Sequence, residues 1–173
     1  MDMIAGFHPL IVKRFAWLDE AATQAFALAL AKQPAIGKVM IELCGDLGAG
    51  KTTFVRHLLS ALGVQGRIKS PTYAVVETYS LALPSDSDAM LDLVNSINIS
   101  HFDFYRFNDP REWEEAGFRD IFASQGLKLV EWPEKAGEYL PKPDLQIAIE
   151  VLNDESRVVT LNAFTALGAE LIA

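Results

Sequence analysis

Hydrophobic and polar positions in the first part of the chain follow two different periods. Residues 18–33 repeat apolar side chains at helical spacing after Asp19, which is a suitable N-cap. Residues 38–43, KVMIEL, form a nearly continuous apolar run that is typical of a buried strand. Residues 51–62 return to helical spacing, and Gly63 follows as a C-cap glycine. The pattern predicts a helix, a buried strand and a second helix.

The remaining pattern is dominated by short strands. It predicts an edge strand over 10–18, strands over 72–81, 97–107 and 127–133, a helix over 108–124 capped by Asp109, a hairpin of 144–154 with 156–164, and a short last helix. Residues 82–96 are polar and acidic and predict an inserted loop or a short surface helix. Strands that alternate with helices and end in a hairpin predict an α/β fold. We expect one domain over residues 1–173, a three-layer sandwich around a mixed, partly antiparallel sheet.

The sequence GDLGAGKT, residues 45–52, lies between the predicted strand and helix and fits the phosphate-loop pattern G-x-x-x-x-G-K-[ST]. Its glycines let the backbone approach a ligand closely, and consecutive N–H groups can surround a phosphate. In such loops the lysine reaches the β- and γ-phosphates and the threonine hydroxyl binds Mg²⁺. The motif and its context predict a P-loop NTPase-like fold that binds a nucleoside triphosphate with Mg²⁺. The predicted contact residues are Gly45, Asp46, Leu47, Gly48, Ala49, Gly50, Lys51 and Thr52.

Composition and charge narrow the partners. The chain has 173 residues and a formal net charge of −8, which argues against a surface for tight, non-specific nucleic-acid binding. Arg67 and Lys69 in GRIK favour a solvated loop over a basic patch. The single cysteine, Cys44, excludes an internal disulfide. Because we find neither a signal-peptide pattern nor an apolar run of membrane-spanning length, we expect a cytoplasmic protein without a membrane partner.

Two acidic residues follow apolar strand segments and are candidates for the Mg²⁺ site. Glu131 ends LKLVE, and Asp103 ends the less regular ISHFD. In P-loop enzymes a carboxylate at the carboxyl end of a neighbouring strand positions the metal, and a second group orients the nucleophile. Either acid alone fits an ordinary turn, but both together after a phosphate loop favour a catalytic role.

Three further segments carry polar or aromatic candidates. Ser70, Thr72 and Tyr73 in KSPTY can hydrogen-bond a phosphate or an attacking water, or form a switch loop, although the pattern also fits a plain turn. Trp132 suits either ligand stacking or the core. His101 shares a strand face with Asp103 and is typical of a structural histidine.

The class of P-loop protein is open between three functions. The Asn-Lys-x-Asp run that reads guanine is missing, so ATP is the expected nucleotide. A small-molecule kinase is one alternative, although no lid-like insertion is visible around the arginines Arg106, Arg111 and Arg119. A nucleotide-gated interaction module with negligible turnover is the other.

Four motifs together are specific to one family. GDLGAGKTT, KSPTY, HFDFYR and LVEWP, in this order and spacing, resemble the bacterial TsaE (YjeE) family over about residues 15–152. The chain departs from the family's pattern at about residues 81–97, where its connection looks longer.

The resemblance implies roles for individual residues. Residues 45–52 would hold the phosphates, Thr53 would support them, and Thr52 and Glu131 would be Mg²⁺ ligands. Asp103 would be a Walker-B-like acid that orients the attacking water, and Thr72 would lie near the γ-phosphate. Trp132 would affect ATP hydrolysis or partner contact, and residues 18–23 would line the adenine.

The resemblance also implies an activity and partners. The family is a P-loop ATPase needed to form threonylcarbamoyladenosine at position 37 of tRNAs that read codons beginning with A. Its members act with the TsaD–TsaB pair, in which TsaD transfers the threonylcarbamoyl group and the ATPase resets or regulates the complex. Contact with tRNA would then be indirect, which is compatible with the acidic charge.

Overall fold

A computed structural model describes residues 7–82 and 96–173. The predicted loop or helix over 82–96 therefore lies, apart from its two ends, outside the described residues. The elements are β1 (Ile11–Trp17), α1 (Glu20–Ala31), β2 (Met40–Cys44), α2 (Lys51–Leu62), β3 (Val76–Ala82), β4 (Ser96–Asp103), α3 (Arg111–Glu115), α4 (Arg119–Ala123), β5 (Leu127–Glu131), β6 (Leu145–Val151), β7 (Arg157–Ala163) and α5 (Ala166–Leu171). Short 3₁₀ turns occupy Ile36–Lys38, Pro133–Lys135 and Gly137–Tyr139.

In the described part of the chain, seven strands form one sheet in the order β1-β7-β6-β2-β5-β4-β3. The central strand β2 is parallel to β5 and β6, and β4 is parallel to β5. The pairs β1–β7, β6–β7 and β3–β4 are antiparallel. The predicted mixed sheet, edge strand and terminal hairpin are confirmed.

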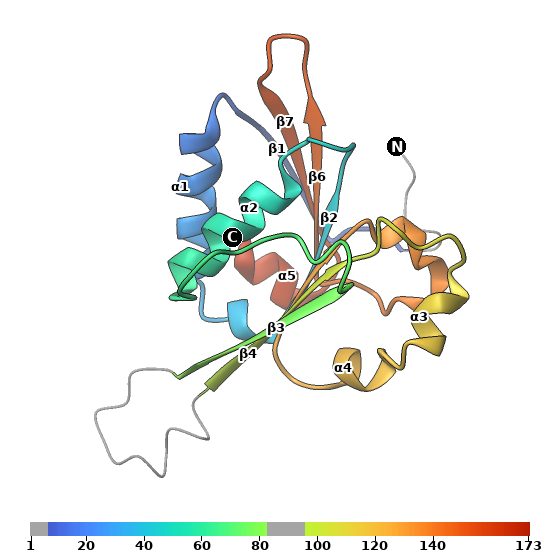
Figure 1. The fold of residues 1–173 in the computed structure, drawn as a ribbon. Coiled ribbons are helices and arrows are strands. Elements are labelled where there is room, and N and C mark those ends of the chain that lie inside the picture. The colour runs from blue at the N-terminus through green and yellow to red at the C-terminus, as the bar shows by residue number, and fades with distance from the viewer. Residues whose placement is uncertain (1–6, 83–95) are drawn as a thin grey trace, which may run out of the picture.

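Two hydrophobic clusters cover the two faces of the sheet. One contains Ile41 and Leu43 of β2, Phe54 and Leu58 of α2, and residues of α1 and α5. The other joins Phe102 of β4 to aromatic residues around α3 and α4. Figure 1 shows α1 and α2 on one side of the sheet and α3 and α4 on the other. The arrangement is the predicted three-layer α/β sandwich.

The structure corrects several predicted boundaries. The predicted helix over 108–124 is broken into α3 and α4 at Gly117, whose φ of 74° is left-handed. The N-cap of α3 is Pro110, without a side-chain cap, rather than the predicted Asp109, although the Asp109 carboxylate accepts from the N–H of Arg111 at 2.9 Å. The predicted strand over 38–43 begins at Met40, because a 3₁₀ turn precedes it.

The loop KSPTY also differs from its predicted extended form. Residues 72–75 turn rather than pair in the sheet, and β3 begins only at Val76. The predicted strand over 97–107 ends at Asp103 for a related reason, since the chain turns at Phe104, whose carbonyl accepts from Phe107 N–H at 2.9 Å. Both shortened strands leave polar side chains free to meet at one edge of the sheet.

A polar row crosses the sheet beneath the phosphate loop. Glu42, Gln146 and Asn162 are register partners on β2, β6 and β7, and an amide hydrogen bond of 3.1 Å joins the last two. Glu42 is buried, and its contact with Gln146 is long at 3.4 Å. Burial raises the pKa of Glu42 from 4.5 to about 7; the bond to Gln146 lowers it and Glu134 raises it further. The folded state therefore favours the protonated form of Glu42, and ionisation of this carboxyl destabilises the fold.

Among the described residues, no helix has the length and apolar content needed to cross a membrane.

Leu58→Ala should lower the free energy of unfolding by about 2–5 kcal/mol, because Leu58 is fully buried between α2 and the sheet. Leu28→Ala is the matched control on α1, where the side chain is 46% exposed, and it should change stability by less than about 0.5 kcal/mol. Urea denaturation measures both. Equal losses would show that α2 does not pack on the sheet as described.

Stability should fall as pH rises through the window between the unfolded and folded pKa values of Glu42, 4.5 and about 7. In this window the folded state holds the proton more tightly, so raising the pH costs the fold about 3 kcal/mol in all. Glu42→Gln should remove this part of the pH dependence and exceed the parent chain in stability at pH 8. Parallel stability–pH curves for the two proteins would contradict the prediction.

Candidate functional site

The carboxyl ends of three parallel strands meet at one edge of the sheet, and the candidate site lies there. Asp103 ends β4, Glu131 ends β5, and Cys44 ends β2 just before the phosphate loop. Asp103 and Glu131 are register partners, as are Leu43 and Glu131. The sheet therefore brings together the loop and the two acids, which lie far apart in the sequence.

The loop backbone has the conformation that its glycines allow. At Gly45, φ is 144°, and a Cβ there would lie 2.4 Å from the carbonyl oxygen of Ile149 on β6. Gly50 is the N-cap of α2, is also left-handed, and supplies no side-chain cap. The first N–H groups of α2 therefore have no partner within the helix and point toward the loop. A bound phosphate would satisfy them.

Lys51 is almost fully buried under the loop. Its Nζ donates to the carbonyl oxygens of Gly45 and Asp46 and lies 4.0 Å from the ring centroid of Trp132. Burial lowers the pKa of Lys51, and the negative charges of Glu131, Glu134 and Asp103 oppose that shift. The ammonium group is thus held by the loop into which a phosphate would fit.

Glu131 links the sheet to the first turn of α2. Its two carboxylate oxygens accept from the Thr52 hydroxyl at 3.1 and 2.9 Å. His101 approaches the same carboxylate, with Nε2 2.8 Å from Oε1. Glu131 is 2% exposed and His101 is fully buried. The structure therefore places Glu131, rather than Asp103, in direct contact with Thr52.

Asp103 is surrounded by donors from two loops. Its Oδ2 accepts from the hydroxyls of Ser70 and Thr72, the latter at 3.1 Å, and its Oδ1 accepts from the backbone N–H of Tyr105 at 2.9 Å. Ser70 and Thr72 are also 3.1 Å apart. These bonds fold the KSPTY loop over the end of β4 and explain why it leaves the sheet.

Aromatic residues line the outer side of this site. Trp132 has left-handed backbone angles, φ 58° and ψ 50°, and its ring lies 5.0 Å from that of Tyr105. Strained backbone of this kind gathers at functional sites. Tyr73 is 86% exposed and carries the Arg106 guanidinium over its ring at 4.1 Å. Trp132 is therefore half-buried: it packs against the second hydrophobic cluster and also lies against the Lys51 ammonium group.

The donor set fits a magnesium nucleotide. Thr52, Glu131 and Asp103 offer hydroxyl and carboxylate oxygens, which are the ligands Mg²⁺ prefers. Within the described residues no three His, Cys, Asp or Glu side chains converge as a protein-only metal cage. Mg²⁺ in phosphate-loop sites takes only one or two protein ligands and completes its shell with phosphates and water, so the two observations agree.

Four of the remaining predicted parts of the described chain, Thr53, Leu47, the Asp46 side chain and the segment 18–23, have no hydrogen bond to Lys51, Thr52, Asp103 or Glu131, although the Asp46 carbonyl accepts from Lys51. Thr53 is half-buried in the first turn of α2, and Leu47 and Asp46 are exposed on the loop. The segment 18–23 lies at the start of α1, where Glu20 contacts His57 of α2 at 2.9 Å. Its adenine role stays a prediction.

Sequence reasoning missed one residue at the site. Arg157, at the start of β7, donates from Nε to the carbonyl oxygen of Ala49 in the loop at 3.2 Å. No motif around Arg157 signals this contact, since it arises from the order of β6 and β7 in the sheet. His101 was placed on the strand face of Asp103 as a structural histidine, and its bond to Glu131 follows from the parallel pairing of β4 with β5, which the sequence did not predict.

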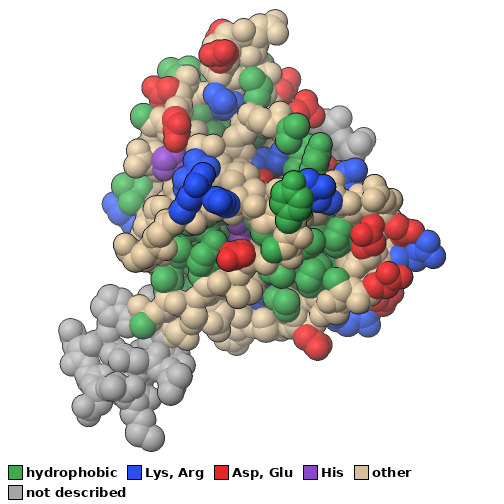
Figure 2. Space-filling view, in the orientation of Figure 1, with side chains coloured by type: hydrophobic (Ala, Val, Ile, Leu, Met, Phe, Trp, Pro, Cys, Tyr) green, Lys and Arg blue, Asp and Glu red, His purple; other side chains and the backbone are tan. Residues whose placement is uncertain are grey.

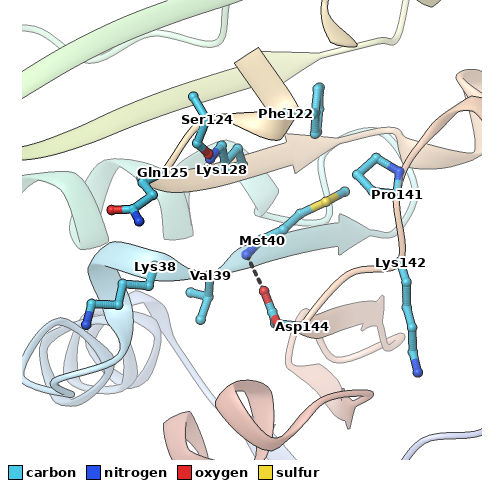
Figure 3. Close-up of a pocket in the computed structure, with 11 residues that line it drawn as sticks. Lys38, Val39, Met40, Phe122, Ser124, Gln125, Lys128, Pro141, Lys142 and Asp144 are labelled. Carbon is cyan, nitrogen blue, oxygen red and sulfur yellow. Dashed lines mark hydrogen bonds between the residues drawn. The ribbon is translucent and has the colours of Figure 1, made fainter. Parts of the chain in front are cut away.

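A cavity of about 430 Å³ lies at the opposite edge of the sheet, around the start of β2 and β5. Figure 3 shows Lys38 and Lys142 directed to different sides of it, while the Asp144 carboxylate bonds to the Met40 N–H at 2.8 Å. Its polar groups do not converge on one point, so the phosphate-loop edge is the stronger candidate.

Comparisons with known proteins identify the family of the chain. The family model "Threonylcarbamoyl adenosine biosynthesis protein TsaE" matches residues 17–159. The tRNA threonylcarbamoyladenosine biosynthesis protein TsaE of Haemophilus influenzae is 40% identical over 148 residues, 86% of this chain and 85% of the relative. The protein of the same name from Bacillus subtilis is 36% identical over 159 residues, 91% of this chain and 89% of the relative.

A solved structure supports the same conclusion. The crystal structure of Bacillus subtilis YdiB superposes with a TM-score of 0.67 at 29% identity, covering 94% of this chain and 93% of the other. Sequence and fold therefore match over the segment that carries the phosphate loop and both acids. The resemblance drawn from the four motifs is confirmed, and the chain belongs to the TsaE family.

Proposed function

We propose that this chain binds and hydrolyses Mg-ATP and acts with TsaD and TsaB homologues in forming threonylcarbamoyladenosine at position 37 of tRNAs that read codons beginning with A. The observation that carries the proposal is the set of Lys51, Thr52, Glu131 and Asp103 beside one glycine loop, in which the three charged residues are buried and Thr52 is half-buried. The names of the relatives supply the pathway.

The residues divide the work by position. Lys51 would exchange its bonds to loop carbonyls for bonds to the β- and γ-phosphates. Thr52 and Glu131 would hold Mg²⁺, which when bound neutralises charge developing on the phosphates. Asp103 would accept a hydrogen bond from the attacking water and fix its direction. The Gly50 end of α2 would place its free N–H groups on the phosphates.

The KSPTY loop is the proposed link to the partners. Ser70 and Thr72 bond to Asp103, so a change at Asp103 on nucleotide binding reaches the exposed Tyr73. In Figure 2, hydrophobic and basic side chains lie together in the middle of the drawn face, which the loop crosses in Figure 1. Hydrolysis would remove the γ-phosphate contacts and release or reset the complex, as in other nucleotide switches.

The purified chain should hydrolyse ATP weakly and should do so faster when a TsaD–TsaB pair is added. Lys51→Ala should abolish nucleotide binding or hydrolysis, because it removes the cation that meets the phosphates. Lys142→Ala, an exposed lysine beside the remote cavity, is the matched control and should behave as the parent chain. Free phosphate release measures all three.

Each other outcome points to a different class. Normal turnover by Lys51→Ala would show that the site is wrongly assigned. ATP consumption without matching free phosphate, and only with a small acceptor, would favour the small-molecule kinase. Nucleotide binding without turnover, alone or with the pair, would favour a nucleotide-gated interaction module.

Asp103→Asn and Glu131→Gln should have different effects, although both remove one negative charge. Glu131 contacts Thr52, so Glu131→Gln should raise the Mg²⁺ concentration needed for half-maximal ATP binding. Asp103→Asn should retain Mg-ATP binding and slow hydrolysis, by about 10²- to 10⁴-fold if Asp103 orients the water. Titrating Mg²⁺ for both variants separates the roles, and identical profiles would contradict the division.

A further inference from the structure

The Glu131 carboxylate has two hydrogen-bond partners, Thr52 and His101. The roles proposed above explain the contact with Thr52 but give no role to His101. The Thr52 hydroxyl holds the carboxylate from α2, at the place where a metal ion would bind. His101 holds it from β4, with Nε2 2.8 Å from Oε1, the same oxygen that lies 3.1 Å from Thr52. The imidazole therefore sits behind the carboxylate, away from the solvent side of the site.

The sheet register makes this contact possible. His101 pairs with Leu129, and Asp103 pairs with Glu131, on adjacent parallel strands. Residues 99, 101 and 103 alternate onto the face that α2 covers, as do 127, 129 and 131. His101 is thus one step behind Asp103 on the same face, and its ring extends forward to the neighbouring strand's terminal acid.

The surroundings of His101 indicate that its bond to Glu131 explains why position 101 is a histidine. The side chain is fully buried, and its Nδ1 has no hydrogen-bond partner within the described chain. The neighbouring positions on this face, Ile99 and Leu129, are apolar and fully packed. If this position served stability alone, an apolar side chain would be more favourable, because a buried polar atom without a partner destabilises the folded state. The Nε2–H tautomer satisfies the carboxylate and leaves Nδ1 without a hydrogen.

The bond from His101 also affects whether Glu131 turns toward Thr52 or toward Lys51. Glu131 is the strongest of the nearby carboxylates acting on Lys51, where it raises the pKa against the effect of burial. A carboxylate on a flexible side chain would be drawn to that ammonium group, and both would then be lost to the nucleotide. A second, fixed donor holds Glu131 toward Thr52 instead.

We propose that His101 is a positioning residue whose Nε2–H fixes the Glu131 carboxylate toward Thr52 and thereby sets the affinity for the magnesium ion of Mg-ATP. The inference rests on the proposed function. Outer partners that orient a ligating group typically change metal affinity or activity by about 10- to 100-fold when they are removed.

The test compares His101→Gln with His101→Asn. The glutamine amide nitrogen can occupy the place of Nε2, whereas the shorter asparagine reaches only the place of Nδ1. Both variants bury one polar amide, so they carry a similar burden for folding. The readout is the fluorescence of a methylanthraniloyl-ATP probe, titrated with Mg²⁺ and repeated in EDTA, with the melting temperature of the free chain measured alongside.

His101→Asn should raise the Mg²⁺ concentration for half-maximal probe binding by about 10- to 100-fold, with probe binding in EDTA unchanged. His101→Gln should stay close to the parent chain. Equal Mg²⁺ dependence in all three proteins would overturn the inference. So would a loss in EDTA that matches the loss in Mg²⁺, because that pattern reports a structural role only.

A measurement on the parent chain keeps the inference testable if the asparagine variant does not fold. The chain has three histidines, and ¹⁵N–¹H correlation of their rings distinguishes the two neutral tautomers. The Nε2–H form at His101 is expected, and an Nδ1–H form would refute the inference. Failure of the proposed function is seen separately, as a parent chain that shows no Mg²⁺-dependent probe binding and no hydrolysis, and the inference then fails with it.

Discussion

The hydrogen bonds between Glu131 and Thr52 join the end of β5 to the first turn of α2, and the geometry of the whole site depends on that junction. They are possible only because β2, β5 and β4 are parallel and end at the same edge. The tight approach of Gly45 to β6 then directs the loop back over that edge, so that Lys51 is covered by its own loop. The order of the strands therefore determines the site, because a neighbour other than β5 beside β2 would leave the phosphate loop without Glu131.

Buried charge is the main energetic constraint on this arrangement. Lys51, Asp103 and Glu131 are each at most 4% exposed, and isolated ions at such depth would be strongly unfavourable. Each has hydrogen-bond partners instead: carbonyls for Lys51, hydroxyls and an amide for Asp103, and a hydroxyl and an imidazole for Glu131. Most of these partners are neutral, so the charges of Lys51, Asp103 and Glu131 are solvated by hydrogen bonds but are not neutralised. An anion bound beside Lys51, together with a divalent cation beside the two carboxylates, would supply the opposite charges.

The sequence predicted the parts of this structure that local chemistry determines. The glycine loop, the helix after it, Gly63 as its C-cap and the final hairpin depend on short-range patterns, and the structure has all of them. The break at Gly117 was missed because a single glycine within an otherwise helical pattern does not reveal whether the helix continues. The start of β3 was missed because Thr72 bonds to Asp103, a contact 31 residues away, and this overrides the strand propensity of the segment. Arg157 was invisible for the same reason, since only the sheet order brings it to the loop.

The distribution of charge bears on how an acidic chain could serve a tRNA modification. The net charge of −8 would repel a polyanion over most of the surface, and Figure 2 shows acidic side chains gathered on the side of α3. Exposed aromatic and basic groups, Tyr73 with Arg106, occur instead on the KSPTY loop and just after the end of β4. A surface of that kind suits a protein partner, since interfaces favour tyrosine and arginine at their centres. Because Tyr73 belongs to the loop that Asp103 holds, the same residues that would sense the nucleotide also set the shape of the surface offered to a partner.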